Sequence, residues 1–338
     1  MHDYEHQLRE NMSQRQFDVT YIEKCCKYAR DLLDKKLPVI FDKHHVENIL
    51  RLQKINLCGY HSFSIANSKK VRIITAPGRE LKLRQRWILD EILNKVEITP
   101  YAHGFESGRS IKTNAVMHAK NAYVICMDIK EFFSSIPESK VREIFSEIGY
   151  STSAAATLAK VCCFSECLPQ GAPSSPRLAN IAFNDIDLKL ALIAKSKNAV
   201  YSRYADDLTF SSNENINSIF SDVEETLRDS VFRINMEKCR SFMPTQPKII
   251  TGLIVQSGRV RVPKRFKRLL KQEIYYCKKF GALTHLENRN AYRMINYREY
   301  LYGKAYYIKM IEPEVGEYFL EDLDTIEWPV FSINAHLK

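Results

Sequence analysis

The sequence has 338 residues, 45% of them hydrophobic, and it carries a formal net charge of +10. This length and composition favour a globular protein of several subdomains, and the charge favours a polyanionic partner. The first residues lack a basic stretch followed by an apolar core, and no apolar run approaches the ~20 residues of a membrane span, so we expect neither a signal peptide nor a membrane partner. The nine cysteines then indicate reduced thiols of a cytoplasmic protein.

The N-terminal part of the chain combines helical patterns with one predicted hairpin. Apolar residues at helical spacing indicate helices within residues 1–57, with a break at Pro38. The runs Tyr60–Ile65 and Val71–Thr75 are rich in β-forming residues and flank a polar turn at residues 67–70, which predicts a β-hairpin. Helical spacing then returns between Leu81 and Val96.

A buried strand is predicted to end at an acidic residue. Residues 122–127 are mostly apolar, and Asp128 follows them directly. Residues 134–137 predict the start of a helix, with Pro137 near its first turn. Farther along, residues 168–176 contain three prolines and one glycine and predict a rigid loop before a helical pattern from Arg177 to Leu192.

Two aspartates stand at the tip of a second predicted hairpin. Residues 199–203 and 208–211 are β-prone, and between them residues 204–207 read Tyr-Ala-Asp-Asp. Adjacent strand side chains point to opposite faces, so Asp206 and Asp207 have unequal roles. If the strand that ends at Asp128 is a neighbour, the three carboxylates converge and are enough to hold two Mg²⁺ ions, which use few protein carboxylates.

Basic and aromatic residues dominate the C-terminal part. Residues 249–256 and 259–263 predict a hairpin, followed by two long helices. From Arg259 to Lys309 there are fourteen Lys and Arg against three Glu, with eight tyrosines interleaved. This combination favours contact with structured RNA, and a solvated helix face over packed tyrosines is the alternative. The segment 312–327 is rich in Asp and Glu and contains no Lys or Arg. It either docks on the basic helices or binds a protein partner.

Three features of the sequence, taken in order, resemble the polymerase core of reverse transcriptases. They are the strand that ends at Asp128, the Gln-Gly-Ala-Pro-Ser-Ser-Pro loop at residues 170–176 and the Tyr-Ala-Asp-Asp hairpin. Residues 114–118 (Asn-Ala-Val-Met-His) and 250–252 (Ile-Thr-Gly) resemble the Asn-Ala-x-x-His and Val-Thr-Gly signatures of retron reverse transcriptases, with Ile for Val in the second. The similarity covers about residues 72–253. It implies an α+β right-hand polymerase fold: an N-terminal helical extension and fingers at 1–121, a palm with an antiparallel sheet at 122–247, and a helical thumb with an acidic tail at 248–338.

The resemblance also implies roles for individual residues in catalysis. Asp128, Asp206 and Asp207 would be catalytic and, with Ile129, would hold two Mg²⁺ ions. Four residues would contact the nucleotide: Arg72, Arg79, Phe133 and Gln170. Phe133 would exclude a 2′-hydroxyl, and Phe132 beside it would lie in the core. For Arg79 a generic surface cation is the alternative. Lys238 would be the general acid, with a solvated loop lysine as its alternative.

For RNA contact the resemblance implies Asn114, His118 and Thr251, and the basic segment 259–309 adds Lys264, Arg265, Lys267 and Arg268 as candidates. Asn114 and His118 are four residues apart, so a pair that packs a helix is an equal alternative.

Retron enzymes make a branched RNA–DNA hybrid (msDNA) from a dedicated non-coding RNA. The expected partners are therefore a cognate non-coding RNA, its DNA product, dNTPs and an effector protein of a bacterial anti-phage defence system. Two alternatives stay open: another bacterial reverse transcriptase of the group II intron or abortive-infection type, and a catalytically silent RNA-binding scaffold. No maturase or endonuclease pattern follows the thumb, which disfavours the intron type.

Overall fold

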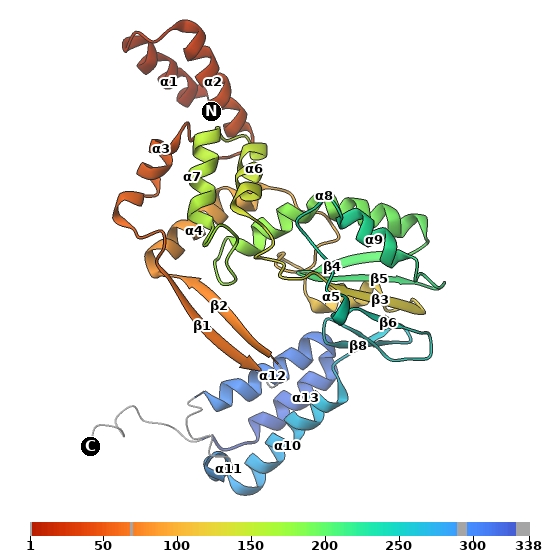
Figure 1. The fold of residues 1–338 in the computed structure, drawn as a ribbon. Coiled ribbons are helices and arrows are strands. Elements are labelled where there is room, and N and C mark those ends of the chain that lie inside the picture. Colours follow the sequence, from red (N-terminus) through yellow and green to blue (C-terminus); the bar gives the residue numbers. More distant parts are fainter. Residues whose placement is uncertain (1, 68–69, 289–295, 329–338) are drawn as a thin grey trace, which may run out of the picture.

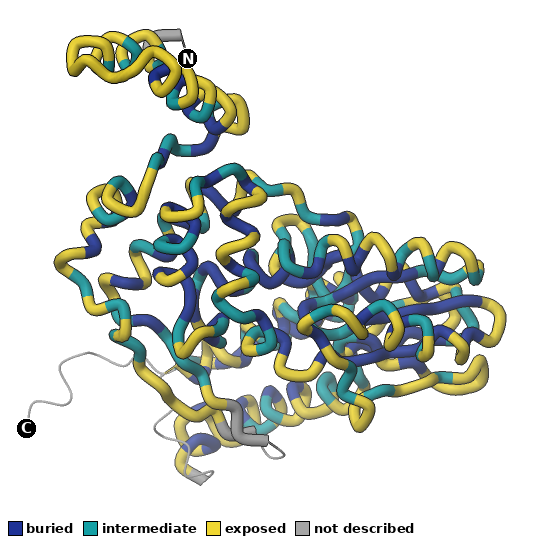
Figure 2. The backbone as a smooth tube through the Cα atoms, turned by 45° about the horizontal axis from the view of Figure 1, so that its top comes forward, coloured by how far each residue is buried: buried dark blue, intermediate teal, exposed yellow. Residues whose placement is uncertain are grey.

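The computed structural model describes residues 2–67, 70–288 and 296–328 of the chain (Figure 1). Its first two helices form a hairpin that projects from the body of the molecule and is exposed along most of its length (Figures 1 and 2). The N-terminal helices are α1 (His2–Gln14), α2 (Val19–Asp34) and α3 (Lys43–Ile49). Pro38 lies between α2 and α3, where the sequence predicts the break.

The first predicted hairpin is confirmed, with longer strands than expected. Strand β1 (Tyr60–Asn67) pairs antiparallel with β2 (Lys70–Pro77). The helical pattern that follows is divided into α4 (Arg79–Glu91) and a short 3-10 turn (Leu93–Lys95). In Figure 1 this hairpin reaches from the N-terminal half toward helix α12 (Tyr297–Ile311) near the other end of the chain.

The central layer is a four-stranded antiparallel sheet with the strand order β4-β5-β3-β6. Its strands are β3 (Tyr123–Asp128), β4 (Val200–Tyr204), β5 (Asp207–Ser212) and β6 (Arg240–Phe242). Alternate residues of each strand face opposite sides of this sheet. Ile125, Tyr201 and Phe210 lie on the side where the larger hydrophobic core forms. That core is completed by helices α6 (Glu138–Ile148), α7 (Thr152–Cys162), α8 (Ser175–Ser196) and α9 (Ile219–Leu227).

The other face of the sheet packs against α5 (Ile111–Met117) and the C-terminal part, in a second core that includes Val124 and Cys126. This part starts with a three-stranded sheet of β7 (Lys248–Ile250), β8 (Leu253–Gln256) and β9 (Arg259–Arg261). The predicted hairpin around residues 257–258 is confirmed by the pairing of β8 with β9, but the prediction of one strand over 249–256 is wrong. Thr251 and Gly252 have φ values of 45° and 82°, so they turn the chain between β7 and β8.

Two long helices, α10 (Lys264–Phe280) and α12, follow as predicted, together with α11 (Ala282–Asn288) and α13 (Pro313–Asp324). The acidic segment docks within the molecule. Glu312 pairs with Lys267 at 2.9 Å, and on α13 Glu317 contacts Lys309 and Asp322 contacts Lys278. None of the helices in the described ranges is long and apolar enough to cross a membrane.

Candidate active site

The sheet register brings the predicted carboxylates together. Asp128 is the last residue of β3, and it lies directly opposite Asp207, the first residue of β5. Directly opposed residues of an antiparallel pair share one face of the sheet. Ala205 and Asp206 form the turn between β4 and β5, and the Asp206 carbonyl accepts the Ile129 amide at 2.9 Å. Three carboxylates from distant parts of the sequence therefore meet at one edge of the palm.

The electrostatics of this edge are those of crowded negative charges. Burial and the carboxylates of Asp206 and Asp128 raise the pKa of Asp207 to about 6, although Arg240 and Lys238 act in the opposite direction. The Lys238 ammonium contacts the Asp128 carboxylate directly. Within the described ranges, no three His, Cys, Asp or Glu side chains are already arranged as a set of metal ligands. A divalent cation would relieve the same repulsion that raises the pKa of Asp207, so the carboxylates suit one chemically.

A cavity of about 440 Å³ opens beside the carboxylates. It is lined by residues from the sequence-predicted site and by further residues of the same region: Phe105, Ile129, Glu131, Phe132, Phe133, Ser134, Leu168, Gln170, Tyr204, Ala205, Asp206, Asp207 and Lys238. Sequence analysis missed Phe105 and Tyr204 as parts of this cavity. Phe105 lies in a loop without a periodic pattern, so local spacing gives no signal for it.

The two neighbouring phenylalanines of the palm have different surroundings, as the sequence suggested. Phe132 is only 4% exposed and contacts Phe183 and Phe232, so it belongs mainly to the core. Phe133 is half-buried in the cavity wall, where its ring centroid lies 6.0 Å from that of Phe105. Both rings line the cavity, and the side chain expected to meet the sugar is the less buried of the two.

The proline-rich loop is tied to the fingers hairpin. The Gln170 carbonyl accepts a hydrogen bond from the Thr75 amide at 2.8 Å. Gly171 has a φ of 137°, and a Cβ at that position would lie 2.8 Å from the Thr75 carbonyl oxygen. The glycine therefore permits a close backbone approach that fixes Gln170 at the cavity.

The two predicted triphosphate arginines lie on β2 and at the start of α4. Arg72 belongs to β2 opposite Ile65, and its side chain lies outside the described residues. Arg79 is the exposed first residue of α4 and is not among the residues that line the cavity.

A fully buried ion pair contacts the β4–β5 hairpin that carries Asp206 and Asp207. Arg203 of β4 donates two hydrogen bonds to the Asp187 carboxylate of α8, at 2.9 and 2.7 Å, and both side chains are completely buried. The same guanidinium donates to the Ala205 carbonyl at 3.1 Å and lies 4.7 Å from the centre of the Phe183 ring. Sequence analysis missed this pair. The sequence held one signal for it. Asp187 is acidic, yet it follows Phe183 by four residues and precedes Leu190 by three, which places it on the buried face of the helix.

The predicted RNA contact of Asn114 and His118 is corrected by their burial, because neither has exposed surface. His118 lies between the hydroxyls of Ser211 and Ser202, at 2.7 Å from each, and Ser202 donates to Asn114 at 2.7 Å. This arrangement fits a neutral imidazole with its proton on Nε2, and burial lowers the pKa of His118 to about 3. The pair ties α5 to β4 and β5, which is the helix-packing alternative.

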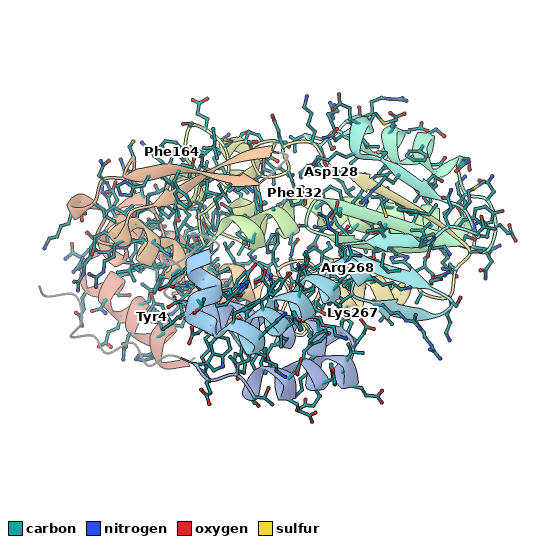
Figure 3. The ribbon with its side chains drawn as sticks, turned by 90° about the horizontal axis from the view of Figure 1, so that it is seen from below. Tyr4, Asp128, Phe132, Phe164, Lys267 and Arg268 are labelled. Atoms are coloured by element: carbon teal, nitrogen blue, oxygen red, sulfur yellow. The ribbon has the colours of Figure 1, made fainter. Side chains whose placement is uncertain are left out.

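The predicted RNA-binding residues of the thumb differ in their availability. Lys264, Arg265 and Arg268 are exposed on α10, and no described residue bonds to their side chains. Lys267 instead donates to both carboxylate oxygens of Glu312, at 2.9 and 3.0 Å. Thr251 lies in the β7–β8 turn, and its hydroxyl donates to the Ile111 carbonyl at 3.4 Å. Figure 3 shows the thumb residues Lys267 and Arg268 across from Asp128 and Phe132 of the palm.

Comparisons with known proteins agree with this geometry. A family model described as "Reverse transcriptase (RNA-dependent DNA polymerase)" matches residues 62–273. The Retron Ec86 reverse transcriptase of Escherichia coli is 33% identical over 64% of this chain and 69% of its own length. The Retron Mx65 and Mx162 reverse transcriptases of Myxococcus xanthus are 33% and 30% identical over 76% of this chain, which spans only 62% and 58% of their lengths.

Among solved structures, a telomerase of Candida albicans in complex with a fragment of telomeric RNA has a TM-score of 0.46 and 10% identity, with 81% of this chain and 64% of that chain covered. That likeness is too low to support an argument. The family model and the retron relatives carry the assignment, and they confirm the expected α+β polymerase fold. The chain belongs to the retron-type reverse transcriptases, which are RNA-dependent DNA polymerases.

Proposed function

We propose that this reverse transcriptase copies a cognate structured non-coding RNA into DNA that stays joined to the RNA as msDNA. One observation carries the catalytic part of the proposal: Asp128, Asp206 and Asp207 meet beside a cavity lined by Phe133, Gln170 and Lys238. A cavity of about 440 Å³ is within the usual range of small-ligand sites, so it has room for a nucleotide. The retron relatives support the RNA-templated part and disfavour the intron-type alternative.

Two Mg²⁺ ions would be held by Asp128, Asp206 and Asp207, with the main chain of Ile129 beside them. When bound, such ions activate the attacking hydroxyl and stabilise the leaving phosphate. The raised pKa of Asp207 supports this assignment, because closely spaced carboxylates resist being ionised together without a cation. Lys238 would hold a proton close to Asp128 and donate it to the pyrophosphate leaving group.

The cavity wall would select and orient the nucleotide. Phe133 would stand against the sugar and clash with a 2′-hydroxyl, and Gln170 would pack against the nucleotide from a loop held by the fingers hairpin. Arg72 and Arg79 are proposed to reach the triphosphate, because a guanidinium presents several donors to phosphate oxygens.

The cognate RNA would be gripped by the exposed basic face of α10. Lys264, Arg265 and Arg268 carry charges that no described residue neutralises, whereas Lys267 is engaged with Glu312 and so is assigned to holding the acidic segment in place. Thr251, in the turn between β7 and β8, is also proposed to contact RNA. The family resemblance implies priming from a 2′-hydroxyl within the RNA, which requires the folded RNA to be held in one register while its end enters the palm.

We further propose that the protein works in the bacterial cytoplasm with an effector protein, as part of an anti-phage defence system. Family resemblance alone supports this part of the proposal. Loss of phage protection in cells that carry Asp206→Asn would link the defence to DNA synthesis.

The experiment that tests the catalytic proposal is primer extension with Mg²⁺ on a generic RNA template, combined with an RNA-binding measurement. Asp206→Asn keeps the size of the side chain but removes a charge, so extension should fall to background while RNA binding persists. Asp229→Asn, at an exposed position outside the cavity, is the matched control. Extension by Asp206→Asn near the wild-type rate would refute the metal assignment, and an inactive wild-type protein would favour the silent scaffold.

A second experiment tests the retron part, by sequencing the nucleic acid that copurifies with the protein. Branched RNA–DNA molecules of one sequence support msDNA synthesis. Unrelated RNA fragments would instead favour a general reverse transcriptase.

A further inference from the structure

Phe105 has an unusual backbone conformation for an aromatic residue. Its φ is 64°, in the left-handed region that is unfavourable for an L-residue with a bulky side chain, and the residue is 50% exposed. The ring therefore does not offset this strain by deep burial. Strain of this kind is retained where the surrounding structure enforces it, and such positions cluster at functional sites.

Both neighbours of Phe105 are held by buried groups. A Cβ on Gly104 would lie 2.4 Å from the Ala205 amide nitrogen, so this segment packs directly against the catalytic turn. Asn180 donates to the Gly104 carbonyl at 3.0 Å and to the Glu106 carboxylate at 2.8 Å, and Arg177 donates to the same carboxylate at 2.6 Å. The loop is fixed on each side of Phe105, which leaves its ring in the cavity wall.

The Phe105 ring closes a row of aromatic side chains. Its centroid lies 6.0 Å from that of Phe133, with the ring planes at 52°. Phe133 also lies 5.6 Å from Phe132, which in turn stacks on Phe232 at 5.6 Å. Phe133 thus contacts both a buried core ring and one strained, half-exposed ring.

We infer that Phe105 is a positioning residue for sugar selection, because it holds the Phe133 ring where that ring blocks a ribose 2′-hydroxyl. A steric filter rejects by clash, so it depends on a side chain that cannot tilt away. The core side of Phe133 is fixed by Phe132, and Phe105 supplies the restraint on the solvent side. This inference rests on the proposed role of Phe133 and adds to it the residue that makes the filter rigid.

The test is single-nucleotide incorporation of a dNTP and the matching rNTP on one primer–template. The ratio of their kcat/KM values is measured for the wild type, Phe105→Ala, Phe133→Ala and the double variant. Phe105→Ala should lower the discrimination ratio by about 2- to 10-fold, which corresponds to the roughly 0.5–1.5 kcal/mol of an aromatic pair. Phe133→Ala should lower it more, and adding Phe105→Ala to it should change little, since both act through one ring.

Two further variants separate the ring from the backbone. Phe105→Gly also removes the ring but suits a φ of 64°, so it should lose the same discrimination as Phe105→Ala. Phe17→Ala, at a half-exposed aromatic between α1 and α2, should leave the ratio unchanged.

The outcomes separate the inference from the proposal beneath it. If Phe133→Ala relaxes discrimination and Phe105→Ala does not, the role of Phe105 is refuted and that of Phe133 stands. If Phe133→Ala has no effect, the sugar filter itself is refuted. Phe105 would only support the backbone under either of two results. Phe105→Ala could lower kcat/KM equally for the dNTP and the rNTP, or Phe105→Gly could keep the wild-type discrimination ratio.

Discussion

Replacement of Arg203 by methionine tests whether the buried ion pair supports the β4–β5 hairpin, where Asp206 and Asp207 are proposed to be catalytic. Methionine has similar length and no charge, so Arg203→Met leaves the Asp187 carboxylate fully buried without its cation. Tyr201 and Thr99 still donate hydrogen bonds to Asp187, at 2.7 and 3.0 Å, but neither neutralises its charge. The Ala205 carbonyl in the turn beside Asp206 also loses its donor.

The expected destabilisation follows from this uncompensated charge. Removal of one partner of a buried pair costs about 3–5 kcal/mol, whereas removal of both in favour of apolar side chains is often neutral. Arg203→Met should therefore lower the free energy of unfolding by about 3–5 kcal/mol, and Arg203→Met/Asp187→Leu should recover most of that loss. Arg203→Met and the double variant both lack the hydrogen bond to Ala205, so primer extension by both should be lower than that by the wild type.

Urea unfolding and primer extension measure the two effects separately. Arg142→Met, at an exposed position on α6, serves as the control and should change the free energy of unfolding by less than about 0.5 kcal/mol. If Arg203→Met lowers the free energy of unfolding no more than Arg142→Met does, the reasoning about stability is refuted. A stable double variant with full extension activity would show that the pair does not position the hairpin.

Two other predictions concern pH and RNA binding. Because the pKa of Asp207 is raised to about 6, extension should decrease as the pH falls through about 6, where the carboxyl gains a proton and no longer suits a cation. The folded state binds that proton more tightly than the unfolded chain, so without metal the contribution of Asp207 to the free energy of unfolding should rise as the pH falls from about 6 toward the ordinary aspartate pKa of about 3.9. Burial of neutral His118 acts in the opposite direction over this range, so the contribution is measured as the difference between the wild type and Asp207→Asn, and a difference that does not change with pH would contradict it. Replacement of Lys264, Arg265 and Arg268 by alanine should weaken RNA binding and reduce the log–log salt slope by roughly 0.7–0.9 per lost phosphate contact. Extension of a generic primer–template should decrease less than synthesis on the cognate RNA, and equal losses on both would mean that α10 only holds duplex.

Local sequence patterns determined the elements that carry the proposed catalytic residues. The alternation on either side of residues 204–207 specified a hairpin, and the apolar run before Asp128 specified a buried strand, because side-chain periodicity follows directly from strand geometry. The same reasoning failed at residues 249–256. A turn at Thr251 and Gly252 interrupts an otherwise strand-like run, and one glycine was too weak a signal for it.

Contacts between distant residues were decided only by the tertiary structure. Helical spacing placed Asn114 and His118 on one face, but spacing is the same for a pair that binds RNA and for a pair buried against a sheet. Lys267 resembled its basic neighbours on α10 until the fold brought Glu312, 45 residues away, to its side.

Two further features depend in the same way on which strands and helices become neighbours. One is the register that sets Asp128 opposite Asp207, and the other is the burial of Arg203 against Asp187. Sequence thus determined which side chains are available for catalysis. The packing of the chain decided which of them meet, because proximity between residues far apart in sequence is a property of the whole fold.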